Sequence, residues 1–101
     1  MVIVGGTFEL DPHKRDLFLA SRTEMMRTSR SEPGCLEYTF CADPLDPGRV
    51  VLFERWTDQD ALDAHLVIRR ASPEPDDGSV VAPISSSIVI YDVSGERRLG
   101  G

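Results

Sequence analysis

Three stretches of the chain alternate apolar and polar residues, and a fourth is rich in β-branched and apolar residues, which together predict four β-strands. They are Val2–Leu10, Cys35–Ala42, Arg49–Thr57 and Ser87–Val93. The first contains Gly5-Gly6, which we interpret as a bulge or as a close approach of the backbone to a neighbour. These strands are the framework on which the other elements are placed.

Two further stretches repeat apolar residues at helical spacing and begin with capping signals. One runs from Asp11-Pro12 to about Arg30 without another glycine or proline, and we predict a single long amphipathic helix there. The other begins at Thr57-Asp58-Gln59-Asp60 and ends at about Arg70. Its apolar stripe includes His65.

Turn-forming residues separate these elements and set their order. Pro33-Gly34 ends the first helix, Asp43–Gly48 is short enough for a hairpin, and Ala71–Ser79 is predicted as an exposed loop. The order β-α-β-β-α-β predicts an α+β, ferredoxin-like fold, in which one antiparallel sheet carries the helices on one face. We expect one domain over residues 1–93 and a polar C-terminal tail over residues 94–101.

The third predicted strand carries apolar side chains on both of its faces. Val50, Leu52 and Trp56 point to one side, whereas Val51 and Phe53 point to the other. Because the helices cover only one face, the other would leave a large apolar patch on a monomer. We therefore predict a homodimer formed through the sheet face.

The charge balance narrows the range of partners. Eleven Lys and Arg against seventeen Asp and Glu give a net charge of −6, and no basic cluster could neutralise a row of phosphates. The longest apolar runs fall far short of the roughly 20 residues that a bilayer span requires, and no signal-type segment follows Met1. We therefore expect a cytoplasmic protein with no nucleic-acid and no membrane partner.

The cysteines predict neither a disulfide nor a metal site. Cys35 and Cys41 share one predicted strand, where six residues at about 3.3 Å each place their Cα atoms roughly 20 Å apart. A disulfide needs less than about 7 Å, so we interpret both as small buried apolar residues. Two cysteines and two scattered histidines are also too few ligands for a metal.

The residues Ser29–Tyr38 (SRSEPGCLEY), Glu54-Arg55-Trp56 and a helix containing Ala61–His65 (ALDAH) resemble the antibiotic biosynthesis monooxygenase family. The resemblance spans about residues 2–93. It implies ferredoxin-like subunits that form a dimeric α+β barrel, each with a cavity between sheet and helices. The chain departs from the family pattern after His65, where a Pro- and Asp-rich segment replaces a longer helical region. Because that region commonly closes the cavity in the family, the sequence does not decide whether the cavity is closed here.

Characterised members of this family carry out several chemistries, among them cofactor-free oxygenation of aromatic polyketides and quinols, haem degradation and a sugar-phosphate isomerisation. The resemblance favours a monooxygenase that oxidises a small electron-rich aromatic, a quinol or anthrone, with O2 and no cofactor. The alternative is a non-catalytic dimeric module of the same fold that binds a small molecule or another protein. An isomerase stays open, whereas haem binding is disfavoured because His13 falls in the first turn of a helix, where we expect it to be exposed.

Five residues make up the candidate site, and each also has a structural interpretation. His65 is the candidate base, because imidazole titrates near neutral pH and its helical stripe faces the sheet. Glu54 could orient that imidazole or form a structural pair with it, and Trp56 could stack on an aromatic substrate or belong to the core. Tyr38 could donate a hydrogen bond to substrate with Phe40 beside it, although two aromatics on one strand face also suit simple packing.

Overall fold

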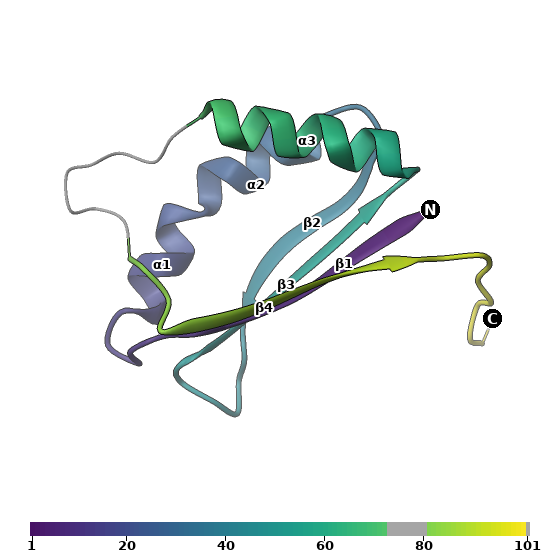
Figure 1. Cartoon of the computed structure of the whole chain (residues 1–101). Helices are drawn as coiled ribbons and strands as arrows, with labels where there is room; N and C mark the ends of the chain where they lie inside the picture. Colours follow the sequence, from purple (N-terminus) through teal and green to yellow (C-terminus); the bar gives the residue numbers. More distant parts are fainter. Residues whose placement is uncertain (73–80, 101) are drawn as a thin grey trace.

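The computed structural model describes residues 1–72 and 81–100, which form one sheet with helices on one of its faces (Figure 1). In chain order the elements are β1 (Val2–Glu9), α1 (Arg15–Ser21), α2 (Thr23–Arg30), β2 (Cys35–Ala42), β3 (Arg49–Trp56), α3 (Gln59–Ala71) and β4 (Ser85–Asp92). The strands lie in the order β2-β3-β1-β4, and every neighbouring pair is antiparallel. The predicted ferredoxin-like α+β fold is confirmed.

The central strand β1 pairs along its whole length with β3 on one side and β4 on the other. The register runs unbroken through Gly5-Gly6, so there is no bulge here. The close approach does occur, since a Cβ on Gly6 would lie 3.2 Å from the Cβ of Leu52. The irregularity falls instead between Cys35 and Glu37 in β2. It leaves Leu36 exposed, although strict alternation along Cys35–Ala42 would put Leu36 on the same face as Tyr38 and Phe40.

The first predicted helix starts later than its capping signal indicated. The carboxylate of Asp11 accepts a hydrogen bond from the backbone N–H of His13 at 2.9 Å, which forms a local turn at residues 12–14. The helix therefore begins at Arg15 and not at Pro12. His13 is exposed, as predicted.

The predicted single helix is also divided in two at Arg22, where α1 ends and α2 begins. Hydroxyl groups on both sides of the break bond back to the preceding turn. Ser21 donates to the carbonyl of Phe18 at 2.6 Å, and Thr23 donates to the carbonyl of Leu19 at 3.3 Å. Such bonds compete with the backbone ladder and bend helices, which explains the break that apolar periodicity alone could not predict.

The core lies between the helices and the sheet face that carries Val50, Leu52 and Trp56, all of which are buried. Phe8, Phe18 and Phe40 pack together at one end, with ring centroids 5.5–6.0 Å apart. Such tilted and edge-on aromatic contacts add to the stabilisation from burial. They fix α1 against β1 and β2.

The opposite face of the sheet has no helix over it (Figure 1). Phe53, Val89 and Tyr91 are 40%, 42% and 54% exposed there, so the predicted apolar patch is present. All eight residues of β4 are exposed. That strand begins two residues earlier than predicted, and most of the predicted loop Ala71–Ser79 lies outside the described residues.

The remaining local predictions concern the tail, the cysteines and the membrane. Residues 94–100 form no helix or strand and are exposed. Both cysteines are free, but Cys41 is exposed and Cys35 half-buried, which corrects the prediction that both are buried. Burial, and then the negative charge of Glu32, raise the pKa of the Cys35 thiol. Among the described helices, none has the length and apolarity to cross a membrane.

Candidate functional site

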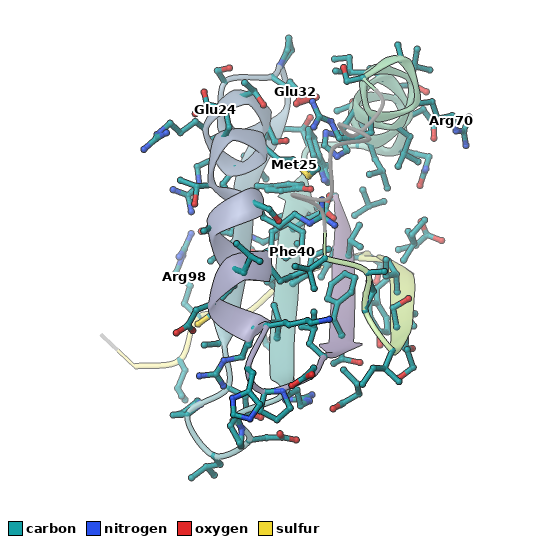
Figure 2. The ribbon with its side chains drawn as sticks, turned by 90° about the vertical axis from the view of Figure 1, so that its left-hand side faces the viewer. Glu24, Met25, Glu32, Phe40, Arg70 and Arg98 are labelled. Carbon is teal, nitrogen blue, oxygen red and sulfur yellow. The ribbon has the colours of Figure 1, made fainter. Side chains whose placement is uncertain are left out.

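A cavity of about 400 Å³ lies between the helices and the buried face of the sheet. Its floor consists largely of apolar strand residues, including Val4, Leu52 and Ile90, and its far walls come from α2 and α3. Met25 of α2 and Phe40 of β2 border it and lie in the space between the helices and the sheet (Figure 2). Gly6 lies between Leu52 and Ile88 in the pairing of the sheet, and a Cβ there would lie 3.2 Å and 3.5 Å from their side chains.

His65 projects from α3 into this cavity and is only 3% exposed. The N-terminus of this helix is capped by Asp58, whose carboxylate accepts a hydrogen bond from the backbone N–H of Ala61 at 2.8 Å. The Nδ1 atom of His65 lies 3.0 Å and 3.3 Å from the two carboxylate oxygens of Glu32. Because a carboxylate accepts, Nδ1 carries a proton in this pair, and in the neutral imidazole the lone pair that a base requires is then on Nε2.

Glu32, which the sequence analysis passed over, is therefore the partner of the imidazole. It belongs to the turn after α2 and reaches toward α3, whereas Glu24 points away into solvent (Figure 2). Its side chain is 12% exposed, and the pair also borders a second hollow of about 270 Å³ beside the turn. The one available signal was its place in the Glu-Pro-Gly turn, because sequence spacing does not show which strand or turn a helix faces.

Gly34 brings this turn close to α3. Its φ of +83° lies in the left-handed region, and its carbonyl accepts the backbone N–H of Thr57 at 2.9 Å. A Cβ here would lie 2.5 Å from the Cβ of Ala61 and 2.7 Å from the hydroxyl of Thr57. Only glycine permits this approach, which holds Glu32 within reach of His65.

Glu54 lines the cavity from β3. The predicted contact between Glu54 and His65 is not a hydrogen bond. Its carboxyl instead accepts the indole N–H of Trp56 at 2.9 Å, while Glu32 holds the imidazole. Burial raises the pKa of Glu54, although the Trp56 hydrogen bond and His65 oppose the shift. The cavity wall thus contains a carboxyl group that holds its proton more tightly than a free glutamic acid does.

Trp56 lies beneath the imidazole and is fully buried. Its ring packs on His65 at a centroid distance of 4.8 Å and an angle of 37°. It is not among the residues that line the cavity, so it supports His65 and Glu54 from below rather than facing the cavity. The sequence left Trp56 either stacked on a substrate or in the core, and its burial places it in the core beside the imidazole.

Tyr38 and Phe40 do line the cavity, as predicted from their shared strand face. The ring of Tyr38 lies 5.2 Å from that of His65, and its hydroxyl donates to the sulfur of Met25 at 3.4 Å. Burial, and then the charge of Glu54, raise the pKa of Tyr38, so the phenol stays protonated. A thioether is a weak acceptor, and a substrate oxygen would be a better one.

The model of the antibiotic biosynthesis monooxygenase family matches residues 1–67, which include β1 to β3 and His65. The chain belongs to this family. Within the described residues, no group of three or more His, Cys, Asp or Glu side chains could hold a metal ion.

The chain is 36% identical over 65 residues to an uncharacterized protein of Synechocystis. That match covers 64% of this chain and 44% of the Synechocystis protein, so the chain spans less than half the length of that relative. It is 26% identical to the "putative monooxygenase YcnE" of Bacillus subtilis, over 64% of this chain and 68% of that protein.

Solved structures with the same fold superpose over nearly the whole chain. A "putative antibiotic biosynthesis monooxygenase" of Deinococcus radiodurans matches with a TM-score of 0.74 and 25% identity, covering 100% of both chains. The haem-degrading protein MhuD of Mycobacterium tuberculosis matches with a TM-score of 0.71 over 97% of this chain and 100% of its own, at 12% identity. At that identity the likeness concerns the fold alone.

Proposed function

We propose that the chain is a monooxygenase that oxidises a small electron-rich aromatic, anthrone-like or quinol-like, with O2 and without a cofactor. The observation that carries the proposal is the pair of His65 and Glu32 at the wall of an apolar cavity of about 400 Å³. A base that faces an apolar space can remove a proton from a substrate whose anion then reduces O2 directly. Family membership supports the oxygenase class.

For an anthrone, the steps balance with O2 as the only oxidant. Nε2 of His65 takes one proton from the methylene carbon, and the resulting carbanion gives one electron to O2. The two radicals combine to form a C–O bond, and the peroxide oxygen takes the proton from the imidazolium. His65 then removes the second C–H proton, the O–O bond breaks as the C=O bond forms, and the departing hydroxide takes that proton. The products are a quinone and water.

Each neighbour of His65 has a part in this sequence. Glu32 stabilises the imidazolium and holds Nδ1 protonated, so that Nε2 faces the substrate. Tyr38, as a neutral phenol on the cavity wall, donates to the oxygen on which the anion's charge gathers. Trp56 supports the imidazole from below, which makes Glu32 and Trp56 positioning residues and His65 the catalytic one.

The test is O2 consumption by the full chain, in metal-free buffer, with a panel of anthrones and hydroquinones. We expect turnover above the background of the substrate alone, and a loss of about 100-fold or more in His65→Ala. Glu32→Gln should lose part of the rate, with Glu32→Asp retaining more because it keeps the carboxylate. Glu24→Gln, an exposed glutamate on the preceding helix, is the matched control and should behave as wild type.

Two outcomes would contradict the proposal. A rate of O2 consumption that is unchanged in His65→Ala would show that His65 is not the catalytic base. Ligand-dependent stabilisation of the chain without any O2 consumption across the panel would favour the non-catalytic binding module instead.

We also propose that two copies associate through the uncovered face of the sheet. The supporting feature is the run of apolar side chains across three neighbouring strands on that face. They are Ile3, Val51, Phe53, Val89 and Tyr91. In a twofold dimer, the apolar patch of one subunit packs against the same patch of the other subunit, so both patches are buried.

A further inference from the structure

Arg69 is a cation of this cavity that the proposed reaction does not use. It lies four residues beyond His65 on α3, which places both on one face of the helix, and it lines the same cavity. Its Nε atom is buried and has no hydrogen-bond partner within residues 1–72 and 81–100. A buried donor without an acceptor is unfavourable, so this N–H is suited to an acceptor that a ligand brings.

One carboxyl group and one further guanidinium line the cavity with Arg69. Glu54 supplies the carboxyl group, and burial raises its pKa. Arg22 lines the cavity from the junction of α1 and α2, where its guanidinium lies 4.7 Å from the centre of the Phe18 ring. Both arginines act on the nearby hydroxyl of Tyr38, where they oppose the rise in pKa that burial and the charge of Glu54 cause.

A purely structural role would be to complement the dipole at the end of α3, since basic residues there are favourable. Arg70 occupies the same last turn and points away from the sheet and the other helices (Figure 2). That role therefore requires no arginine to face inward. The inward direction of Arg69 needs a different explanation.

We infer that Arg69 binds the carboxylate of an aromatic acid whose rings occupy the apolar part of the cavity beside His65. The two oxygens of a carboxylate match Nε and one terminal nitrogen of a guanidinium, which no single hydroxyl of a neutral quinol can do. The inference rests on the proposed function because it takes the same cavity as the substrate site. It narrows the substrate to electron-rich aromatics that carry a carboxylate.

Binding of a matched pair of unreactive ligands tests this. The full chain is titrated calorimetrically with anthraquinone-2-carboxylate and with anthraquinone-2-carboxamide, which differ in charge but hardly in shape. We expect the carboxylate to bind about tenfold or more tightly, because a charge-assisted pair replaces a neutral contact. Arg69→Met should abolish this preference, and Arg70→Met, which removes the same charge from the same turn, should keep it.

Equal affinities in the wild-type chain would overturn the inference, as would absence of binding by either ligand. A carboxylate preference that survives Arg69→Met, or that disappears in Arg70→Met, would overturn it too. The wild-type comparison requires no variant, so poor folding of Arg69→Met would still leave a decisive measurement. Neither ligand consumes O2, so a failed turnover assay would refute the reaction proposed above without deciding this preference.

Discussion

Glu54 is a carboxyl that the fold places in an apolar wall with one strong donor, the indole of Trp56. Burial raises its pKa above the ordinary value of 4.5. The folded chain therefore holds this proton more tightly than the unfolded chain does. The resulting stabilisation is fully present below the unfolded-chain pKa and is lost as the pH rises through the folded-state pKa.

Glu54→Gln should remove this pH dependence while keeping an oxygen that accepts from Trp56. We expect the variant to melt close to the wild-type temperature near pH 4.5 and above it at pH 8, with a gain that grows as the pH rises and then levels off. Thermal denaturation of both proteins across this range measures the difference. A gain that shrinks with rising pH would contradict the sign of the shift, and Glu24→Gln serves as the exposed control.

Replacing Trp56 tests how much its hydrogen bond to Glu54 contributes to stability. Trp56→Phe keeps an aromatic face under His65 but removes the donor to Glu54, leaving a buried carboxyl without that partner. We expect a loss of about 1–3 kcal/mol in the free energy of unfolding. Urea denaturation measures it, and the loss should be much smaller in a Glu54→Gln background, because a neutral amide suffers less from burial. Equal losses in both backgrounds would show that packing alone is responsible.

At the scale of elements, the turn between α2 and β2 decides whether Glu32 and His65 meet. Gly34→Ala forces an alanine into the left-handed region and its Cβ toward the first turn of α3. We expect a loss of at least about 1–2 kcal/mol in the free energy of unfolding from the backbone conformation alone. Displacement of the turn should also reduce oxygenase activity beyond what the lost stability explains.

Gly95→Ala is the matched control, since a Cβ there would meet nothing within 4 Å. It should leave both stability and activity unchanged. Activity in Gly34→Ala equal to that of wild type, measured where both chains are folded, would show that the turn does not position the site.

The strands were predictable because a period of two is a strong signal wherever one face of a sheet is buried. The helices were predicted less well. Helical spacing of mostly apolar residues extends from Leu17 to Thr28 on both sides of Arg22, yet the hydroxyls of Ser21 and Thr23 interrupt the backbone there. Local side-chain bonds of this kind decide helix ends, and apolar periodicity does not contain them.

The candidate site was predictable in its position but not in its contacts. Strand parity and helical spacing placed Tyr38, Glu54 and His65 around one space, and all three line the cavity. The prediction that Glu54 is the partner of His65 was wrong. The partner is Glu32, which reaches His65 only through the left-handed turn at Gly34. Arg69 was missed, because an arginine in the last turn of a helix ordinarily serves the helix end.

At the scale of the whole molecule, the two faces of the sheet carry similar apolar character but unequal cover. The helices bury Val50 and Leu52 on one face, whereas Phe53 and Tyr91 on the other are 40% and 54% exposed. A domain of about 100 residues has a thin core, so covering this second face would add substantially to its stability. This links the assembly to the site, because β1 and β3 provide the floor of the cavity on one side and the apolar patch on the other.

Phe53→Arg places a charge at the centre of that patch without touching the cavity. In sedimentation equilibrium at micromolar concentration we expect the wild-type chain to have about twice the 11.2 kDa mass of one chain, and Phe53→Arg to have the mass of one. Leu45→Arg, in the exposed hairpin between β2 and β3, adds the same charge elsewhere and should stay dimeric. A wild-type chain of single mass would refute the twofold assembly, and a dimeric Phe53→Arg would place the interface on a different surface. Loss of the dimer should also lower the melting temperature and make that of wild type depend on protein concentration, because association stabilises the folded state by mass action.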